Sequence, residues 1–159
     1  KGVALGYDCH NSIQRALSIF PSNKVCIGCP FYGRGWRKLV KDKSNPSAPI
    51  IFGLSKSGAA TTLSPGSGGE EGLSCWKDLR DKVDKDGFIR YYDSISCVPY
   101  LHNPSTGETW SYDDVESVKN KAQYVKDNNL GGIMIWQLSD DVRDGHDSLL
   151  DAIVETFIQ

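Results

Sequence analysis

The sequence predicts an α/β fold in which a β-rich insertion interrupts an alternation of helices and parallel strands. Two short segments, residues 24–32 and 131–138, are almost continuously apolar, which is typical of strands in a parallel sheet covered on both faces. Segments with helical periodicity flank each of them. The residues between 37 and 110 instead combine prolines, glycines and aromatic residues, a pattern that indicates short antiparallel strands joined by turns.

Three helices are predicted from apolar residues that recur every three or four positions. They cover residues 10–20, residues 113–128 and the segment after the polar loop 139–147. Ser111 and Asp114, three residues apart, resemble a capping box at the start of the second helix. The periodic positions are Ile13, Leu17, Phe20, Val115, Val118, Ala122, Val125, Leu149, Ile153 and Phe157.

The predicted elements divide the chain into one unit formed by residues 1–36 and 111–159 and an insertion formed by residues 37–110. The insertion directly follows the carboxyl end of the first strand, where Tyr32 and Arg34 lie. Ligands of parallel α/β sheets bind at the carboxyl ends of the strands. We therefore expect the insertion to form one wall of a ligand site.

Composition restricts the class of protein. The chain has 159 residues, of which 39% are hydrophobic, and a net charge of −2 with a pI near 5.9. This supports a folded core, and the scattered basic residues argue against nucleic acid or an anionic membrane as the partner. No apolar run approaches the length of about 18 residues that spans a bilayer. Because the first residue is Lys1, we expect a processed, cloned or incomplete product.

The cysteines and histidines give no metal or cofactor signal. Cys26 and Cys29 form a C-x-x-C pair, but no second pair completes a zinc site. Because the pair lies within an apolar strand, we expect buried thiols rather than a redox centre. The five cysteines are an odd number and do not decide the cellular compartment, and the three histidines are widely spaced.

Several segments resemble glycoside hydrolase family 18, the chitinase family. Phe31-Tyr-Gly-Arg-Gly-Trp36 is similar to the strand-seven motif of that family, and residues 130–140 are similar to strand eight. Residues 98–114 resemble the end of its chitinase insertion domain, and residues 65–72 are a looser match to a glycine-rich segment. The resemblance implies a partial (β/α)8 TIM barrel, strands seven and eight with helices six to eight, carrying a small α+β insertion.

The resemblance also implies a function. Members cleave β-1,4-linked N-acetylglucosamine polymers with retention, using the acetamido group of the substrate and a glutamic acid. Trp136 would stack under a sugar, and Tyr32 and Arg34 would hydrogen-bond it. The alternative is a purely structural role, with Trp136 packed in the core and Tyr32 and Arg34 in a turn. Weaker candidates for the cleft wall are Glu71, Trp36 and Trp110. No cofactor is implied, and family members are expected to be secreted.

The chain departs from the family at the catalytic acid. The Asp-x-x-Asp-x-Asp-x-Glu motif of strand four is absent, and the only Asp-x-Glu, at Asp114 and Glu116, is expected to serve a helix N-terminus. We therefore expect no hydrolysis by this chain alone and a missing N-terminal half of the barrel. Two alternatives stay open: a non-catalytic chitin-binding or lectin-like relative, and a small independent α/β interaction domain.

Overall fold

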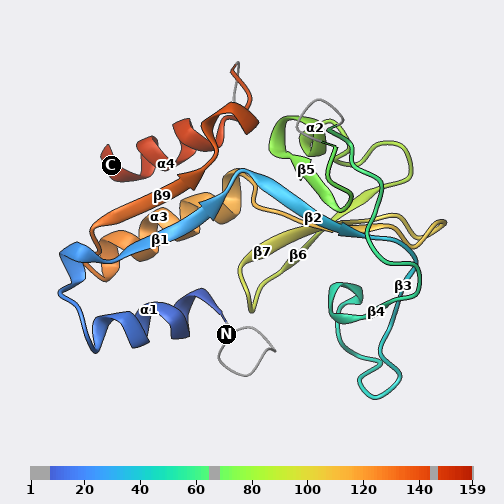
Figure 1. Ribbon diagram of the computed structural model, residues 1–159, viewed down its shortest axis with the longest axis horizontal. Helices are drawn as coiled ribbons and strands as arrows, with labels where there is room; N and C mark the ends of the chain where they lie inside the picture. Colours follow the sequence, from blue (N-terminus) through green and yellow to red (C-terminus); the bar gives the residue numbers. More distant parts are fainter. Residues whose placement is uncertain (1–7, 65–68, 144–146, 159) are drawn as a thin grey trace.

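The computed structural model describes residues 8–64, 69–143 and 147–158 and has an α/β fold. Helices and a pair of parallel strands lie at one end of the elongated molecule, and an antiparallel sheet lies at the other (Figure 1). The long strand path from β1 (Cys26–Pro30) into β2 (Tyr32–Trp36) connects the two ends. This junction therefore determines how the two parts of the chain meet.

At the first end, β1 and β9 (Gly132–Trp136) pair in parallel, from Cys26 opposite Gly132 to Pro30 opposite Trp136. Helices α1 (Cys9–Leu17), α3 (Val115–Asp127) and α4 (Leu149–Ile158) accompany the pair. Ile27 packs in a cluster with side chains of α1 and α3, and Cys29 packs in a second cluster with side chains of α3 and α4. The helices thus cover one face of the two strands.

The expectation that both faces of these strands are buried is wrong for this chain. Burial alternates along β1, where Ile27 and Cys29 are buried but Cys26 is exposed. On β9, Met134 is 52% exposed and Trp136 is 64% exposed. An apolar run cannot distinguish a strand covered twice from a strand with one open apolar face, because the residue types are the same. Consequently the prediction of a buried thiol holds for Cys29 and fails for Cys26.

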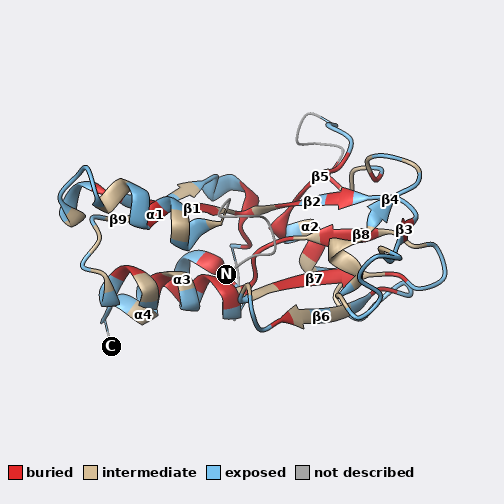
Figure 2. Ribbon diagram, turned by 90° about the horizontal axis from the view of Figure 1, so that it is seen from below, coloured by how far each residue is buried: buried red, intermediate tan, exposed pale blue. Residues whose placement is uncertain are grey.

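At the other end, five antiparallel strands form a sheet in the order β5-β2-β8-β7-β6 (Figure 2). The short helix α2 (Trp76–Arg80) contacts β2 and β5. A separate two-stranded ribbon follows β2. The bounds of these strands are β5 Leu73–Cys75, β8 Thr109–Ser111, β7 Val98–His102, β6 Ile89–Asp93, β3 Leu39–Val40 and β4 Leu54–Ser55. Short 3-10 helices cover Ser22–Lys24, Ile50–Phe52 and Leu138–Asp140.

Strand β2 belongs to this antiparallel sheet, although residues 32–36 were expected to group with the parallel strands. Arg34 pairs with Leu73 of β5 on one side and with Ser111 of β8 on the other. The chain passes from one sheet to the other at Phe31, without an intervening loop. The division into a barrel part and an inserted domain stays a prediction.

The two glycines of β2 explain which way its other side chains point. A Cβ atom on Gly35 would lie 2.4 Å from the indole ring of Trp110, and one on Gly33 would lie 2.7 Å from Leu79. Trp110 and Leu79 are both fully buried. Since neighbouring residues of a strand alternate between faces, the glycines face the core. The three residues Tyr32, Arg34 and Trp36 therefore face the opposite side of the sheet.

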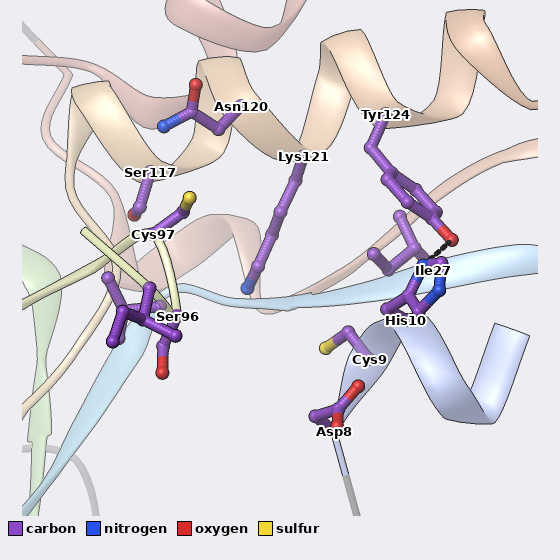
Figure 3. A pocket seen from close by; sticks show the side chains of 12 residues that line it. Asp8, Cys9, His10, Ile27, Ser96, Cys97, Ser117, Asn120, Lys121 and Tyr124 are labelled. Carbon is purple, nitrogen blue, oxygen red and sulfur yellow. Dashed lines mark hydrogen bonds between the residues drawn. The ribbon is translucent and has the colours of Figure 1, made fainter. Parts of the chain in front are cut away.

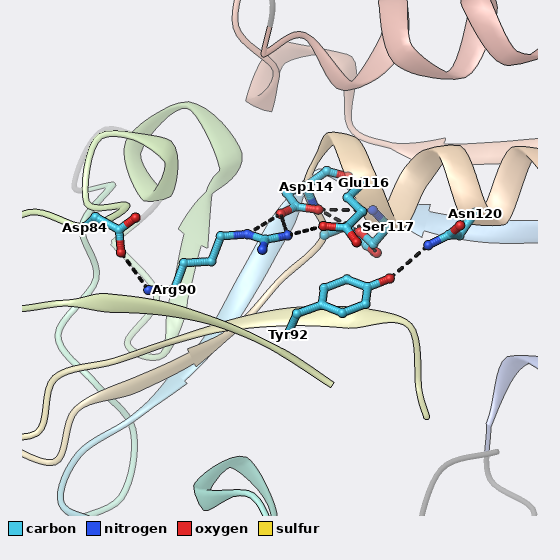
Figure 4. A network of polar contacts seen from close by, with 8 residues as sticks. Asp84, Arg90, Tyr92, Asp114, Glu116, Ser117 and Asn120 are labelled. Carbon is cyan, nitrogen blue, oxygen red and sulfur yellow. Dashed lines mark hydrogen bonds and ion pairs between the residues drawn. The ribbon is translucent and has the colours of Figure 1, made fainter. Parts of the chain in front are cut away.

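An ion-pair network attaches the sheet to helix α3 (Figure 4). Arg90 of β6 donates to Asp114 and to Glu116, each at 2.7 Å from Nη2. Asp114 caps α3 by accepting from the Ser117 N–H at 3.0 Å, while the Ser117 hydroxyl accepts from the Asp114 N–H. The predicted capping pair of Ser111 with Asp114 is thus replaced by the pair of Asp114 with Ser117, because the helix begins at Val115 and not at residue 113.

Candidate functional site

Tyr32 and Trp136 lie at the junction between the two sheets. Trp136 is the last residue of β9 and pairs with Pro30, and its carbonyl oxygen accepts a hydrogen bond of 2.8 Å from the N–H of Phe31. Tyr32 is the next residue and begins β2. The carboxyl end of β9 and the start of β2 are thereby held together by main-chain bonds, which fixes the spacing between the two aromatic residues independently of their side chains.

Arg34 stands beside Tyr32 on the same face of β2. Its guanidinium carbon lies 5.6 Å from the centre of the Tyr32 ring, and its side chain is 47% exposed. Nη1 donates to Oε1 of Glu70 at 2.5 Å, and this bond raises the pKa of Arg34. Because a guanidinium has five N–H donors in a fixed plane, donors are left for a ligand while Glu70 holds the group in place.

The acidic partner at this site is Glu70, which sequence reasoning missed. Glu71, the predicted residue, lies 3.8 Å from Arg37 and is 61% exposed at its side chain. Two adjacent carboxylates in one loop look equivalent in a sequence. The two glutamates are distinguished by the hydrogen bond from the Gly35 N–H to the carbonyl of Gly72, which sets the register of the loop against β2. This bond can be seen only in the three-dimensional structure.

The two remaining tryptophan candidates are placed differently. Trp36 is 36% exposed and shares the face of Arg34. Trp110 is fully buried against Gly35, and its indole N–H donates to Glu108 at 2.8 Å. The structure therefore corrects the prediction for Trp110: its ring belongs to the core, and a ligand cannot reach it.

The accessible groups define what this site can do. Trp136 offers a flat apolar ring, Tyr32 a half-buried phenol and Arg34 a planar set of donors. Aromatic platforms combined with a few polar groups suit ligands that have both C–H faces and hydroxyl or carbonyl groups. None of the three side chains is a carboxylic acid, so the glutamic acid that the family resemblance implies is not among them. Among the described residues, no cluster of three or more His, Cys, Asp or Glu side chains could hold a metal ion.

A separate cavity of about 490 Å³ lies between α1, β1, α3 and the β6–β7 turn (Figure 3). Lys121 reaches into it and pairs with Asp113 at 2.5 Å. Burial lowers the pKa of Lys121, but the charge of Asp113, the nearby thiols and the hydrogen bond to Asp113 together outweigh burial, so the net shift of this pKa is upward. His10 and Tyr124 hydrogen-bond at 3.0 Å on the cavity wall. Tyr32, Arg34 and Trp136 do not line this cavity.

None of the helices in the described ranges is long and apolar enough to cross a membrane.

Residues 4–141 match the model of the glycosyl hydrolases family 18. The chain is 38% identical over 122 residues to chitinase A1 of Niallia circulans, an alignment that covers 76% of this chain and 16% of that protein.

Solved structures agree in fold. The chain resembles chitinase ChiA74 from Bacillus thuringiensis with a TM-score of 0.77 and 32% identity, over 94% of this chain and 25% of that one. It resembles the Ostrinia furnacalis Group IV chitinase, solved in complex with allosamidin, with a TM-score of 0.76 and 25% identity, over 96% of this chain and 40% of that one. The chain spans between 10% and 26% of the length of the first curated relatives it matches. On this combined similarity, the chain belongs to the glycosyl hydrolases of family 18.

Proposed function

We propose that this chain is the substrate-binding, carboxyl-terminal part of a chitinase-like hydrolase that acts on β-1,4-linked N-acetylglucosamine polymers. The observation that supports the proposal is the junction of β9 and β2: the exposed Trp136 is bonded through its main chain to Phe31, the residue before Tyr32, and Arg34 lies beside Tyr32. Trp136 stacks against the C–H face of a sugar ring, and Arg34 and Tyr32 hydrogen-bond its polar groups. Glu70 keeps the guanidinium in position.

The catalytic acid comes from outside this chain. In the retaining, substrate-assisted mechanism, the acetamido oxygen of the substrate attacks the anomeric carbon while a glutamic acid protonates the leaving oxygen. The chain contains no Asp-x-x-Asp-x-Asp-x-Glu motif, so its own residues bind and orient the sugar. The complete protein is secreted, as expected for the family.

The exposed face of β1 and β9 fits this proposal. Met134 and Trp136 would leave more than half of their surface in water in this chain. We infer that they line the interior of a (β/α)8 barrel as strands seven and eight, closed by strands that this chain does not contain. Residues 37–110 then form an insertion that deepens the cleft, and residues 1–36 and 111–159 form the barrel part.

The test is calorimetric titration of the chain with chitohexaose. Arg34→Ala should weaken binding by at least about tenfold, because a hydrogen bond to a charged group contributes about 1.5–3 kcal/mol. Arg37→Ala is the matched control, since Arg37 pairs with Glu71 instead, and it should bind like the wild type. Equal affinity of the Arg34 variant and the wild type would contradict the proposal.

A second assay addresses catalysis. The chain alone should not release fluorophore from a chitobioside substrate, and robust turnover would show that the chain carries a catalytic acid of its own.

The residue at the strand-four position of the complete protein distinguishes a hydrolase from the non-catalytic, lectin-like alternative. An intact Asp-x-x-Asp-x-Asp-x-Glu motif there supports a hydrolase, and replacement of its glutamate supports a binding protein.

A further inference from the structure

The face of the antiparallel sheet that carries Arg34 extends to the far edge strand. Arg34 of β2 is opposite Ser111 of β8, Ser111 is opposite Tyr100 of β7, and Tyr100 is opposite Tyr91 of β6. Residues directly opposite one another in antiparallel strands project from the same face. One row of side chains therefore runs across this face of the sheet, from Arg34 to Tyr91, and both ends of the row are exposed.

An aromatic patch stands at the end of this row. The rings of Tyr91 and Tyr100 are stacked, with centroids 5.2 Å apart and an angle of 12° between their planes. Tyr91 is 37% exposed, whereas Tyr100 is buried. The ring centroids of His102 and Tyr91 are 6.4 Å apart, with the two rings tilted relative to each other. Ile89, on the same strand as Tyr91, is 44% exposed. The edge strand thus presents a flat ring, fixed from behind by a second ring.

Polar atoms of this patch lack hydrogen-bond partners among the described residues. No hydrogen bond among the described residues involves the hydroxyl of Tyr91 or of Tyr100, and the only His102 ring atom that is bonded is Nδ1, to Thr109 at 2.8 Å. The neighbouring Tyr92 differs: its hydroxyl accepts a hydrogen bond from Asn120 and its ring lies under Arg90. The exposed phenol of Tyr91 and one imidazole nitrogen of His102 are therefore available to a ligand.

The chemistry of the patch matches a neutral ligand with apolar faces and many hydroxyl groups. Three strand spacings separate β2 from β6, about 14 Å in all, which exceeds what one sugar ring can bridge. We propose that Tyr91, stacked on Tyr100, is an additional contact for the oligosaccharide held at Tyr32 and Arg34, several sugar units further along. This inference rests on the proposed function and extends it: the chain selects for ligand length.

The test compares chitobiose with chitohexaose in calorimetric titrations. Tyr91→Ala should weaken chitohexaose binding by about fivefold, since an aromatic stacking contact contributes about 0.5–1.5 kcal/mol, and should leave chitobiose binding unchanged. Tyr91→Phe keeps the ring and should retain most of the affinity for chitohexaose. Phe157→Ala removes an aromatic side chain of α4 that is 41% exposed, and it should change neither affinity.

The outcomes separate this inference from the proposed function. If Arg34→Ala weakens both ligands and Tyr91→Ala weakens neither, or weakens both equally, the additional contact is wrong and the proposed function stands. If Arg34→Ala has no effect on either ligand, the proposed function fails and this inference fails with it. A Tyr91→Ala variant that changes only the sedimentation of the chain would show that the patch joins two copies, which also overturns the inference.

Discussion

Replacing Gly35 by alanine should destabilise the chain, because the space beside this glycine is already filled. The added methyl group would lie 2.4–2.6 Å from three atoms of the Trp110 ring. That ring is fully buried and its N–H is bound to Glu108, so it cannot move aside cheaply. Overpacking of this kind costs about 1–3 kcal/mol, and the lower entropy of the unfolded alanine chain offsets about 0.4–1 kcal/mol.

The assay is urea unfolding followed by tryptophan fluorescence. With a slope of about 2 kcal/mol per molar urea, a net loss of about 1–2 kcal/mol lowers the midpoint by roughly 0.5–1 M. Gly28→Ala is the control, since its methyl group would meet only Met134, at an ordinary 3.7 Å, and should leave the midpoint nearly unchanged. If Gly35→Ala unfolds at the wild-type midpoint, the glycines of β2 do not face the core, and the orientation derived for Tyr32 and Arg34 fails.

Three further predictions follow from single contacts. Glu70→Ala should weaken chitohexaose binding by about fivefold in titrations, because a freed arginine must be ordered again by the ligand; Glu71→Ala should not. Iodoacetamide should alkylate Cys26 in the native chain but not Cys29, whose thiol pKa burial raises to about 12, as read by peptide mass spectrometry. Burial lowers the pKa of His102, so its contribution to stability is complete above about pH 6.5 and is lost as pH falls through the folded-state pKa; unfolding of His102→Gln at several pH values should lack this loss.

For each of these three predictions, one experimental result would contradict it. Equal effects of the two glutamate substitutions would show that the salt bridge of Glu70 has no part in binding. Equal alkylation of Cys26 and Cys29 would mean that the two faces of β1 are equally accessible. A wild type and a His102→Gln variant with the same acid dependence would show that this histidine titrates alike in the folded and unfolded chain.

The sequence predicted the α/β class and the main helices because periodicity directly reports which residues are apolar and how they repeat. The strand that ends at Pro30 and the helix built around Val118 are examples. It could not predict that one face of β1 is exposed, because Cys26 and Cys29 are the same residue type within one apolar segment, and the pattern does not distinguish the exposed one from the buried one. Burial depends on which elements pack there, and that information lies outside the segment itself.

The candidate site shows the same division. Motif resemblance predicted Tyr32, Arg34 and Trp136; Trp136 ends β9 and Tyr32 begins β2 at the junction between the two sheets, and their role stays a prediction. The resemblance made Trp110 a weaker candidate for the cleft wall. Its register opposite Gly35 decides for the core, and strand register depends on long-range pairing. Glu70 was missed for the same reason, since its partner is 36 residues away in sequence.

The most direct test of the account is a two-dimensional NMR titration that follows the four tryptophan indole N–H signals as chitohexaose is added. Trp76 and Trp110 are buried, and their indole groups are bonded to Asp147 and Glu108, so their signals should stay in place. The signal of Trp136, assigned through its substitution by phenylalanine, should move and saturate with the ligand. Binding that leaves the Trp136 signal unmoved, or that moves the two buried indoles instead, would contradict a sugar site at the junction of β9 and β2.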